Sequence, residues 1–230
     1  MQYNAKKYPD ITKKAFVEDF IKKSGAKPNP NPSAFFMAGL PGAGKTEFSK
    51  NLIKLVDGAK AVRIDMDEIA TQIKGYRPEI ADEYRGQASK LMNGIYDKVL
   101  KEKLEFIMDG TFGSKSSIKN VERAIDHGYI VKIIYIIQDP KLAWKFTLAR
   151  EKVEHRSISI DGFIKAYFNI INNILMLKPF IEKHDKITLD MVINNEENEI
   201  KSWIPNIRSG IDILLKNSYN NKTLKEYIND

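Results

Sequence analysis

A glycine-rich stretch with a lysine and a threonine has the spacing of a phosphate-binding loop. Residues 39–46 read Gly-Leu-Pro-Gly-Ala-Gly-Lys-Thr and fit the pattern G-x-x-x-x-G-K-[ST]. The backbone N–H groups of such a loop and the N-terminus of the following helix face an anion. Lys45 is suited to neutralise the outer phosphates, and the Thr46 hydroxyl is suited to bind Mg²⁺. The predicted nucleotide-binding residues are Gly39, Leu40, Pro41, Gly42, Ala43, Gly44, Lys45 and Thr46.

The segments on either side of this loop are the ones that the motif requires. Residues 34–38 form a short apolar run that is typical of a buried parallel strand. Residues 47–56 carry apolar side chains at helical spacing, and Asp57-Gly58 ends that pattern. A chance glycine-rich turn with a lysine would lack this strand–loop–helix context.

Strand and helix patterns alternate along the rest of the chain. We predict strands at 34–38, 61–64, 104–108, 129–137 and 186–193, and helices at 10–24, 47–56, 81–103, 118–127, 140–154, 161–178 and from 196 onward. This alternation predicts an α/β fold with a parallel sheet flanked by helices, a P-loop core with an N-terminal helix. We expect one domain over residues 1–193 and a C-terminal helical extension over 194–230.

Two aspartates follow the second predicted strand. The carboxyl ends of parallel strands face the ligand crevice, and side chains two apart in an extended segment point the same way. Asp65 and Asp67 are therefore expected on the same side, near the phosphates. A carboxylate there can accept the proton of an attacking hydroxyl, and we assign this role to Asp67. The alternative is that Asp65 or Asp67 only caps a helix that begins near Glu68.

The third predicted strand also ends in an acidic residue. Residues 106–111 read Phe-Ile-Met-Asp-Gly-Thr, an apolar run with Asp109 at its end, as in a Walker B segment that orients magnesium or its waters. Thr111 has two interpretations, a hydrogen bond to a substrate hydroxyl or a cap for the next helix.

Arg150 and Arg156 lie near the end of a predicted helix and before a Ser- and Gly-containing segment. Arginines on a mobile segment can stabilise the charge of a phosphoryl group during transfer. The alternative is ion pairing on the helix surface, for instance between Arg150 and Glu154.

Composition narrows the class of protein. The chain has no cysteine, which excludes disulfides, a catalytic thiol and a thiolate metal site. It shows neither a signal sequence nor an apolar run long enough to cross a membrane, so we expect a cytoplasmic protein. The net charge of +7 suits an anionic substrate. Nucleic acid is not expected, because the lysines are dispersed and no arginine-rich arm accompanies them.

Taken together, these motifs resemble the zeta toxins, bacterial P-loop kinases of toxin–antitoxin systems. The resemblance rests on residues 33–46, 64–67 and 109–111, with Arg150 and Arg156, and it covers about residues 10–193. It implies an ATP- and Mg²⁺-dependent kinase that phosphorylates a hydroxyl of a UDP-N-acetylsugar, with a small helical antitoxin as a possible partner. It also implies catalytic roles for Asp67, Lys45, Arg150 and Arg156, substrate contacts for Asp109 and Thr111, and Mg²⁺ binding by Thr46.

The sequence departs from the family pattern around the acceptor. Asp109 stands where the family often has Glu, and residues 112–114 replace an arginine expected after the Gly-Thr pair. Other interpretations therefore stay open at this point: a polynucleotide 5′-hydroxyl kinase, an antibiotic kinase, or a nucleotide-binding regulatory module that phosphorylates no acceptor.

Overall fold

The computed structural model describes residues 9–55, 60–154, 158–216 and 218–230. Its strands are β1 (Ser33–Ala38), β2 (Val62–Asp65), β3 (Phe106–Asp109), β4 (Ile130–Ile137), β5 (Ile187–Asn194) and β6 (Ile200–Ile207). Its helices are α1 (Pro9–Ser24), α2 (Lys45–Leu55), α3 (Met66–Thr71), the 3₁₀ turn η1 (Pro78–Ile80), α4 (Ala81–Glu102), α5 (Lys115–Asp126), α6 (Pro140–Glu154), α7 (Ile160–Lys183), α8 (Ile211–Leu214) and α9 (Asn221–Asn229).

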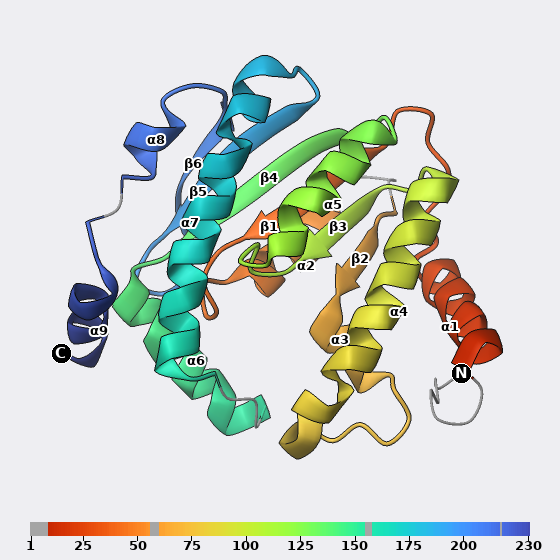
Figure 1. Cartoon of the computed structure of the whole chain (residues 1–230), viewed down its shortest axis with the longest axis horizontal. Helices are drawn as coiled ribbons and strands as arrows, with labels where there is room; N and C mark the ends of the chain where they lie inside the picture. Colours follow the sequence, from red (N-terminus) through yellow and green to blue (C-terminus); the bar gives the residue numbers. More distant parts are fainter. Residues whose placement is uncertain (1–8, 56–59, 155–157, 217) are drawn as a thin grey trace.

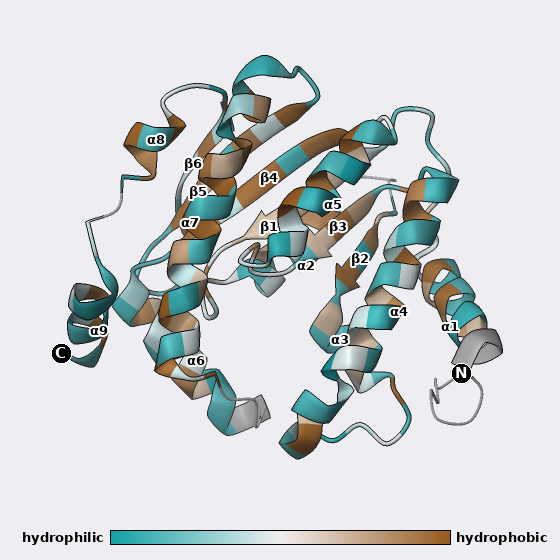
Figure 2. Ribbon diagram, viewed as in Figure 1, coloured by the Kyte–Doolittle hydropathy of each residue, from teal (hydrophilic) through white to brown (hydrophobic). Residues whose placement is uncertain are grey.

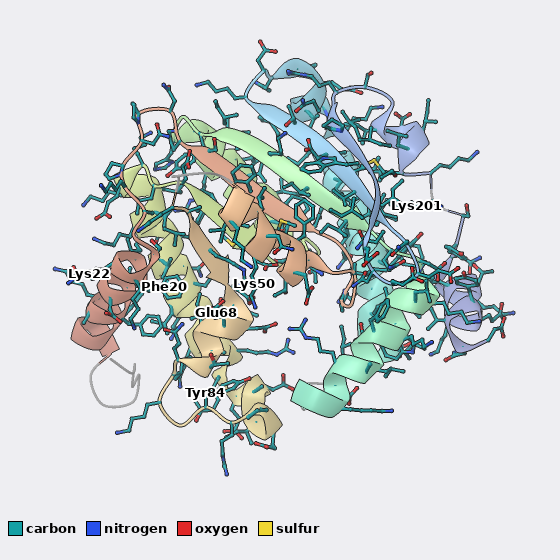
Figure 3. The ribbon with its side chains drawn as sticks, turned by 180° about the vertical axis from the view of Figure 1, so that it is seen from behind. Phe20, Lys22, Lys50, Glu68, Tyr84 and Lys201 are labelled. Atoms are coloured by element: carbon teal, nitrogen blue, oxygen red, sulfur yellow. The ribbon has the colours of Figure 1, made fainter. Side chains whose placement is uncertain are left out.

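The strands form one sheet in the order β2-β3-β1-β4-β5-β6, in which the first five are parallel and β6 is antiparallel to β5. Helices α4, α5 and α7 cover one face, and α2 covers the other, as the front and back views show (Figures 1 and 3). The first strand therefore lies in the middle of the sheet. Its carboxyl end, with the phosphate-binding loop, is flanked by the ends of β3 and β4.

The central strands are buried on both faces, which explains their nearly continuous apolar sequence (Figure 2). An aromatic cluster joins the sheet to α4: the Phe106 ring lies 5.6 Å from Phe36, 5.4 Å from Tyr96 and 5.4 Å from Tyr129, all edge-on. The Tyr129 hydroxyl satisfies carbonyl oxygens where α4 gives way to β3, at 2.9 Å from Val99 and 3.0 Å from Leu104. Aromatic packing thus anchors the strand that carries Asp109.

The sequence prediction was wrong about the start of the C-terminal part. Residues 200–207 form strand β6, whereas a helix was expected from residue 196. A turn at 195–199 reverses the chain, helped by Asn198 at a φ of 66°, a conformation that asparagine tolerates better than most residues. Pro205 is compatible with β6 because this strand lies at the sheet edge. The sheet thus continues past the boundary expected at residue 193.

Of the described residues after β6, those of α8 and α9 are helical, and α9 is tied to the core. In α9, Leu224 and Ile228 are buried, the Tyr227 hydroxyl donates to Asp139 at 2.7 Å, and Lys225 pairs with Asp161 at 2.9 Å. Asp139 precedes α6 and Asp161 lies in the first turn of α7, so α9 is bonded to the N-terminal ends of both helices. No helix among these described residues is long and apolar enough to cross a membrane.

Candidate active site

The loop between β1 and α2 has the shape that phosphate binding requires. Gly42 adopts a φ of +78°, and a Cβ added there would lie 2.1 Å from the carbonyl oxygen of Ala143 in α6. No side chain fits such a gap, because the obstacle is backbone. The sequence pattern therefore reports a real constraint, since α6 packs directly against the loop.

Lys45 is buried against its own loop. Its Nζ donates to the carbonyl oxygen of Leu40 at 2.6 Å. Burial lowers the pKa of Lys45 to about 8, with Asp109 raising it and the positive charge of Arg150 lowering it further. Arg150, an exposed residue of α6, is thus close enough to act electrostatically on the loop. Arg156 lies outside the described residues.

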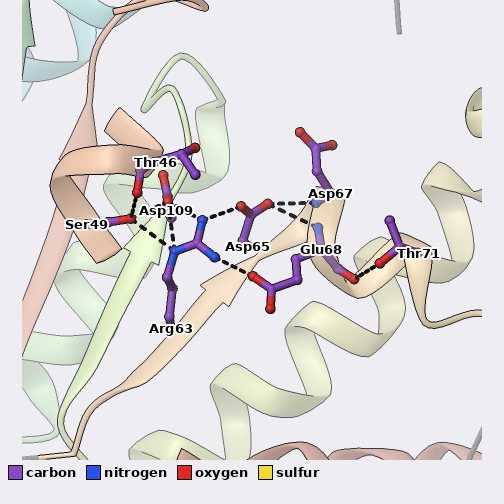
Figure 4. Close-up of polar contacts among 8 residues, drawn as sticks. All are labelled: Thr46, Ser49, Arg63, Asp65, Asp67, Glu68, Thr71 and Asp109. Carbon is purple, nitrogen blue, oxygen red and sulfur yellow. Dashed lines mark hydrogen bonds and ion pairs between the residues drawn. The ribbon is translucent and has the colours of Figure 1, made fainter. Parts of the chain in front are cut away.

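Arg63 connects the ends of β2 and β3 (Figure 4). Its Nη2 lies 2.6 Å from Asp65 Oδ2 and 2.6 Å from Asp109 Oδ2, its Nε lies 3.0 Å from Asp109 Oδ2 and 3.0 Å from Ser49 Oγ, and its Nη1 binds Glu68. The side chains of Arg63 and Asp109 are nearly buried, at 9% and 3% exposure. Three carboxylates thus surround one guanidinium, next to the first turns of α2.

The aspartates of the second strand do not share an extended segment, contrary to the prediction. The strand ends at Asp65, and Asp67 lies in the first turn of α3. Asp65 Oδ1 caps this helix by accepting from the backbone N of Asp67 at 2.8 Å and of Glu68 at 3.3 Å. The exposed Asp67 carboxylate points away from Arg63 (Figure 4). Asp65 is therefore the capping residue, and Asp67 remains the candidate base.

Burial raises the pKa of Asp65, and the neighbouring charge of Asp109 raises it further, whereas Arg63 lowers it. The two carboxylates face each other because Asp65 and Asp109 occupy paired positions of β2 and β3. Arg63 binds both carboxylates through the same nitrogen, Nη2.

The segment after β3 lies beside the phosphate-binding loop. The carbonyl oxygen of Thr111 accepts from the backbone N of Gly39 at 3.2 Å, and Thr111 Oγ1 accepts from Gly113 N at 3.3 Å. Ser114, and not Thr111, caps α5. Asn173 of α7 holds this segment by donating to the carbonyl oxygens of residues 112 and 114. The capping alternative for Thr111 is therefore wrong, and its backbone carbonyl is the group that contacts the loop.

A second support for the loop comes from amide side chains that belong to no recognised motif. Asn194 Nδ2 donates to the carbonyl oxygen of Ala43 at 3.1 Å, and Asn198 Nδ2 lies 3.4 Å from that of Gly42. Gln138 binds the Asn198 side chain at 3.1 Å. Asn194 Oδ1 is buried without a hydrogen-bond partner in the described part of the protein. These amides come from the residue after β4, from β5 and from the turn after β5, so only the fold could reveal them.

The residues present fit a magnesium ion that is bound mainly by phosphates and water. Thr46 lies in the first turn of α2, and its carbonyl oxygen is 3.0 Å from Ser49 Oγ, the group that also contacts Asp109. No group of three acidic or histidine side chains suited to a metal occurs among the residues that the structure describes. Mg²⁺ in nucleotide sites needs no such cage, because it keeps most of its water and phosphate oxygens.

Comparison with known proteins agrees with this geometry. A family model described as Zeta toxin matches residues 18–205. A solved structure from the PezAT chromosomal toxin–antitoxin system of Streptococcus pneumoniae has a TM-score of 0.70 at 21% identity, covering 98% of this chain and 96% of that one. The AvrRxo1-ORF1:ORF2 complex has a TM-score of 0.64 at 13% identity, covering 96% and 73%. An uncharacterized protein of Haemophilus influenzae is 29% identical over 106 residues, which span 45% of this chain and 69% of that protein.

Proposed function

The chain belongs to the zeta toxin family, whose members are P-loop kinase-like toxins of toxin–antitoxin systems, and from this premise we propose that it is an ATP- and Mg²⁺-dependent kinase. The observation that carries the proposal is the meeting of two features at one sheet edge. The phosphate-binding loop lies at the end of β1, and the acidic ends of β2 and β3 lie beside it. The acidic residue at the end of β3 could serve the magnesium ion alone, but a second acidic segment after β2 supplies the base that an acceptor hydroxyl needs.

In the proposed reaction, the loop N–H groups and Lys45 hold the phosphates, and Thr46 takes part in binding the metal. Bound Mg²⁺ neutralises charge on the β- and γ-phosphates. Asp67 accepts the proton of the acceptor hydroxyl while the oxygen–phosphorus bond forms and the bond from phosphorus to the ADP oxygen breaks. Arg150 and Arg156 contribute positive charge to the transferring group.

We propose a hydroxyl of a UDP-N-acetylsugar as the acceptor, with Asp109 and Thr111 as its contacts. Asp109 Oδ2 is already engaged by Arg63 and Ser49, so Oδ1 is the oxygen that would accept from a sugar hydroxyl. Because the Asp109 side chain is shorter than that of a glutamate, its carboxylate lies closer to the end of β3 than a glutamate carboxylate would. This supports an acceptor hydroxyl that enters close to the end of β3.

A partner protein is also proposed. Solved structures of the same fold come from a toxin–antitoxin system and from an ORF1:ORF2 complex. We propose that a small helical antitoxin binds this chain in the same cellular compartment, which we take to be the cytoplasm. Co-purification of such a protein encoded beside this gene, together with a loss of ADP release, would support the pairing.

The test is ADP release with single acceptors, run on the wild type, Asp67→Asn and Lys45→Ala. We expect UDP-N-acetylglucosamine to stimulate release in the wild type, and Asp67→Asn to lower kcat at least about 100-fold while ATP still binds. Lys45→Ala should weaken ATP binding itself. Full phosphoryl transfer by Asp67→Asn would refute the base assignment, and turnover with another hydroxyl compound alone would refute the acceptor.

A further inference from the structure

Arg63 is a residue to which neither the motif nor the proposed reaction gives a role, yet it has the densest set of polar contacts in the site. Its guanidinium binds groups on three elements: Ser49 on α2, Asp109 on β3, and the first turn of α3 through Asp65 and Glu68. Only a planar side chain with several fixed donors can bind partners in so many directions at once.

The contacts to α3 lie on both sides of Asp67 in the chain. Asp65 binds Arg63 through Oδ2 and caps α3 through Oδ1, and Glu68 binds Nη1. The orientation of the turn that carries Asp67 is therefore determined by Arg63 through the residues around it.

The contacts on the other side lead to the phosphate site. Ser49 Oγ lies 3.0 Å from Arg63 Nε and 3.0 Å from the carbonyl oxygen of Thr46. Thr46 is the residue that follows Lys45 in the chain. Asp109 Oδ2 is 2.6 Å from Ser49 Oγ. The phosphate-binding helix and the turn with Asp67 thus share one guanidinium.

From this geometry we propose that Arg63 is a positioning residue that fixes the distance and angle between Asp67 and the phosphate-binding loop, and that holds Asp109 Oδ2 so that Oδ1 faces the acceptor. The proposal rests on the proposed kinase function. Its basis is geometric: one guanidinium binds three neighbouring carboxylates and holds them in place. Arg63 itself touches neither the nucleotide nor the acceptor in this assignment.

The decisive variant is Arg63→Lys, which keeps the charge but cannot bind four partners in one plane. We expect kcat to fall about 100-fold, because a displacement of about 1 Å in a reacting group has that effect. The KM for ATP should change less than about threefold, since the loop and Lys45 are untouched. Arg85→Lys is the matched control and should behave as the wild type, because the polar contact that Arg85 makes within the described residues is an exposed pair with Asp82 on α4.

A second measurement separates positioning from stability. The backbone amides of Asp67 and Glu68 donate to Asp65 Oδ1, so their hydrogen exchange reports how firmly α3 is held. We expect exchange at these amides to be about tenfold faster in Arg63→Lys, with exchange in the central strands unchanged. In the Asp67→Asn background, Arg63→Lys should lower the remaining activity by less than about threefold, because the group that it positions is already lost.

The outcomes are distinct. A wild-type kcat in Arg63→Lys, or slower turnover that parallels faster exchange throughout the sheet, would overturn the proposal. If the wild type phosphorylates no acceptor, the proposed function fails, and unchanged exchange at Asp67 and Glu68 would then overturn the positioning role independently.

Discussion

Nucleotide binding at pH 8 is predicted to take up about half a proton, which Lys45 receives. In the free protein, burial lowers the pKa of Lys45 to about 8, so about half of the molecules carry a neutral amine at that pH. Phosphate oxygens placed against Nζ favour the charged form and raise this pKa again. The phosphates of the nucleotide are already fully ionised at pH 8, because the pKa of their last proton is about 6.

The assay is titration calorimetry with ADP and Mg²⁺ in two buffers of different ionisation enthalpy. The difference in binding heat between the buffers gives the number of protons taken up. At pH 6.5 the uptake by Lys45 should be close to zero, because the amine is then almost fully protonated in the free protein. Lys45→Arg is the control: its side chain stays charged, so the uptake at pH 8 should disappear.

Two results would refute this reasoning. An absence of proton uptake by the wild type at pH 8 would mean that Lys45 is charged before the nucleotide arrives. An equal uptake in Lys45→Arg would mean that another group receives the proton.

The other predictions concern the loop and the core. Gly42→Ala should abolish nucleotide binding measured by calorimetry while the circular dichroism spectrum stays native, because the added methyl group would lie 2.1 Å from a backbone oxygen of α6. Asn198→Gly keeps the φ of 66° accessible but removes an amide against the loop, so nucleotide affinity should fall about fivefold, the effect of one hydrogen bond. Unchanged affinity would show that the turn does not support the loop. Tyr129→Phe should lower the free energy of unfolding in urea by about 1–3 kcal/mol, because the buried carbonyl oxygen of Leu104 loses this donor and that of Val99 keeps only backbone donors; a loss below about 0.5 kcal/mol would contradict this.

Local patterns predicted most of the fold. The five parallel strands were predicted to within about two residues, because each is an apolar run bounded by turn or helix signals. The strand β6 was missed, and the short helix α3 was considered only as an alternative, a helix that begins near Glu68. Six residues are too few for a helical period to be recognised, and β6 is largely exposed, so its sequence lacks a clear buried face.

The residues of the candidate site also fall into two groups, those that a sequence motif indicated and those that only the structure revealed. The glycine-rich loop, Asp67 and Asp109 could be proposed from sequence because each belongs to a short contiguous motif. Arg63 lies beside Asp65 in the chain, but its principal partner Asp109 is 46 residues away. Asn194 is 151 residues from the loop carbonyl that it binds.

The amino-acid sequence alone thus determined which loop is the candidate phosphate site and which strand ends are acidic, since backbone conformation and strand pattern are encoded by neighbouring residues. Only the tertiary structure decided which aspartate caps α3 and which one is exposed, and which cation lies between the carboxylates. The physical reason is that hydrogen bonds and ion pairs depend on positions within about 3 Å, and those positions exist only after distant segments have been packed side by side in the sheet.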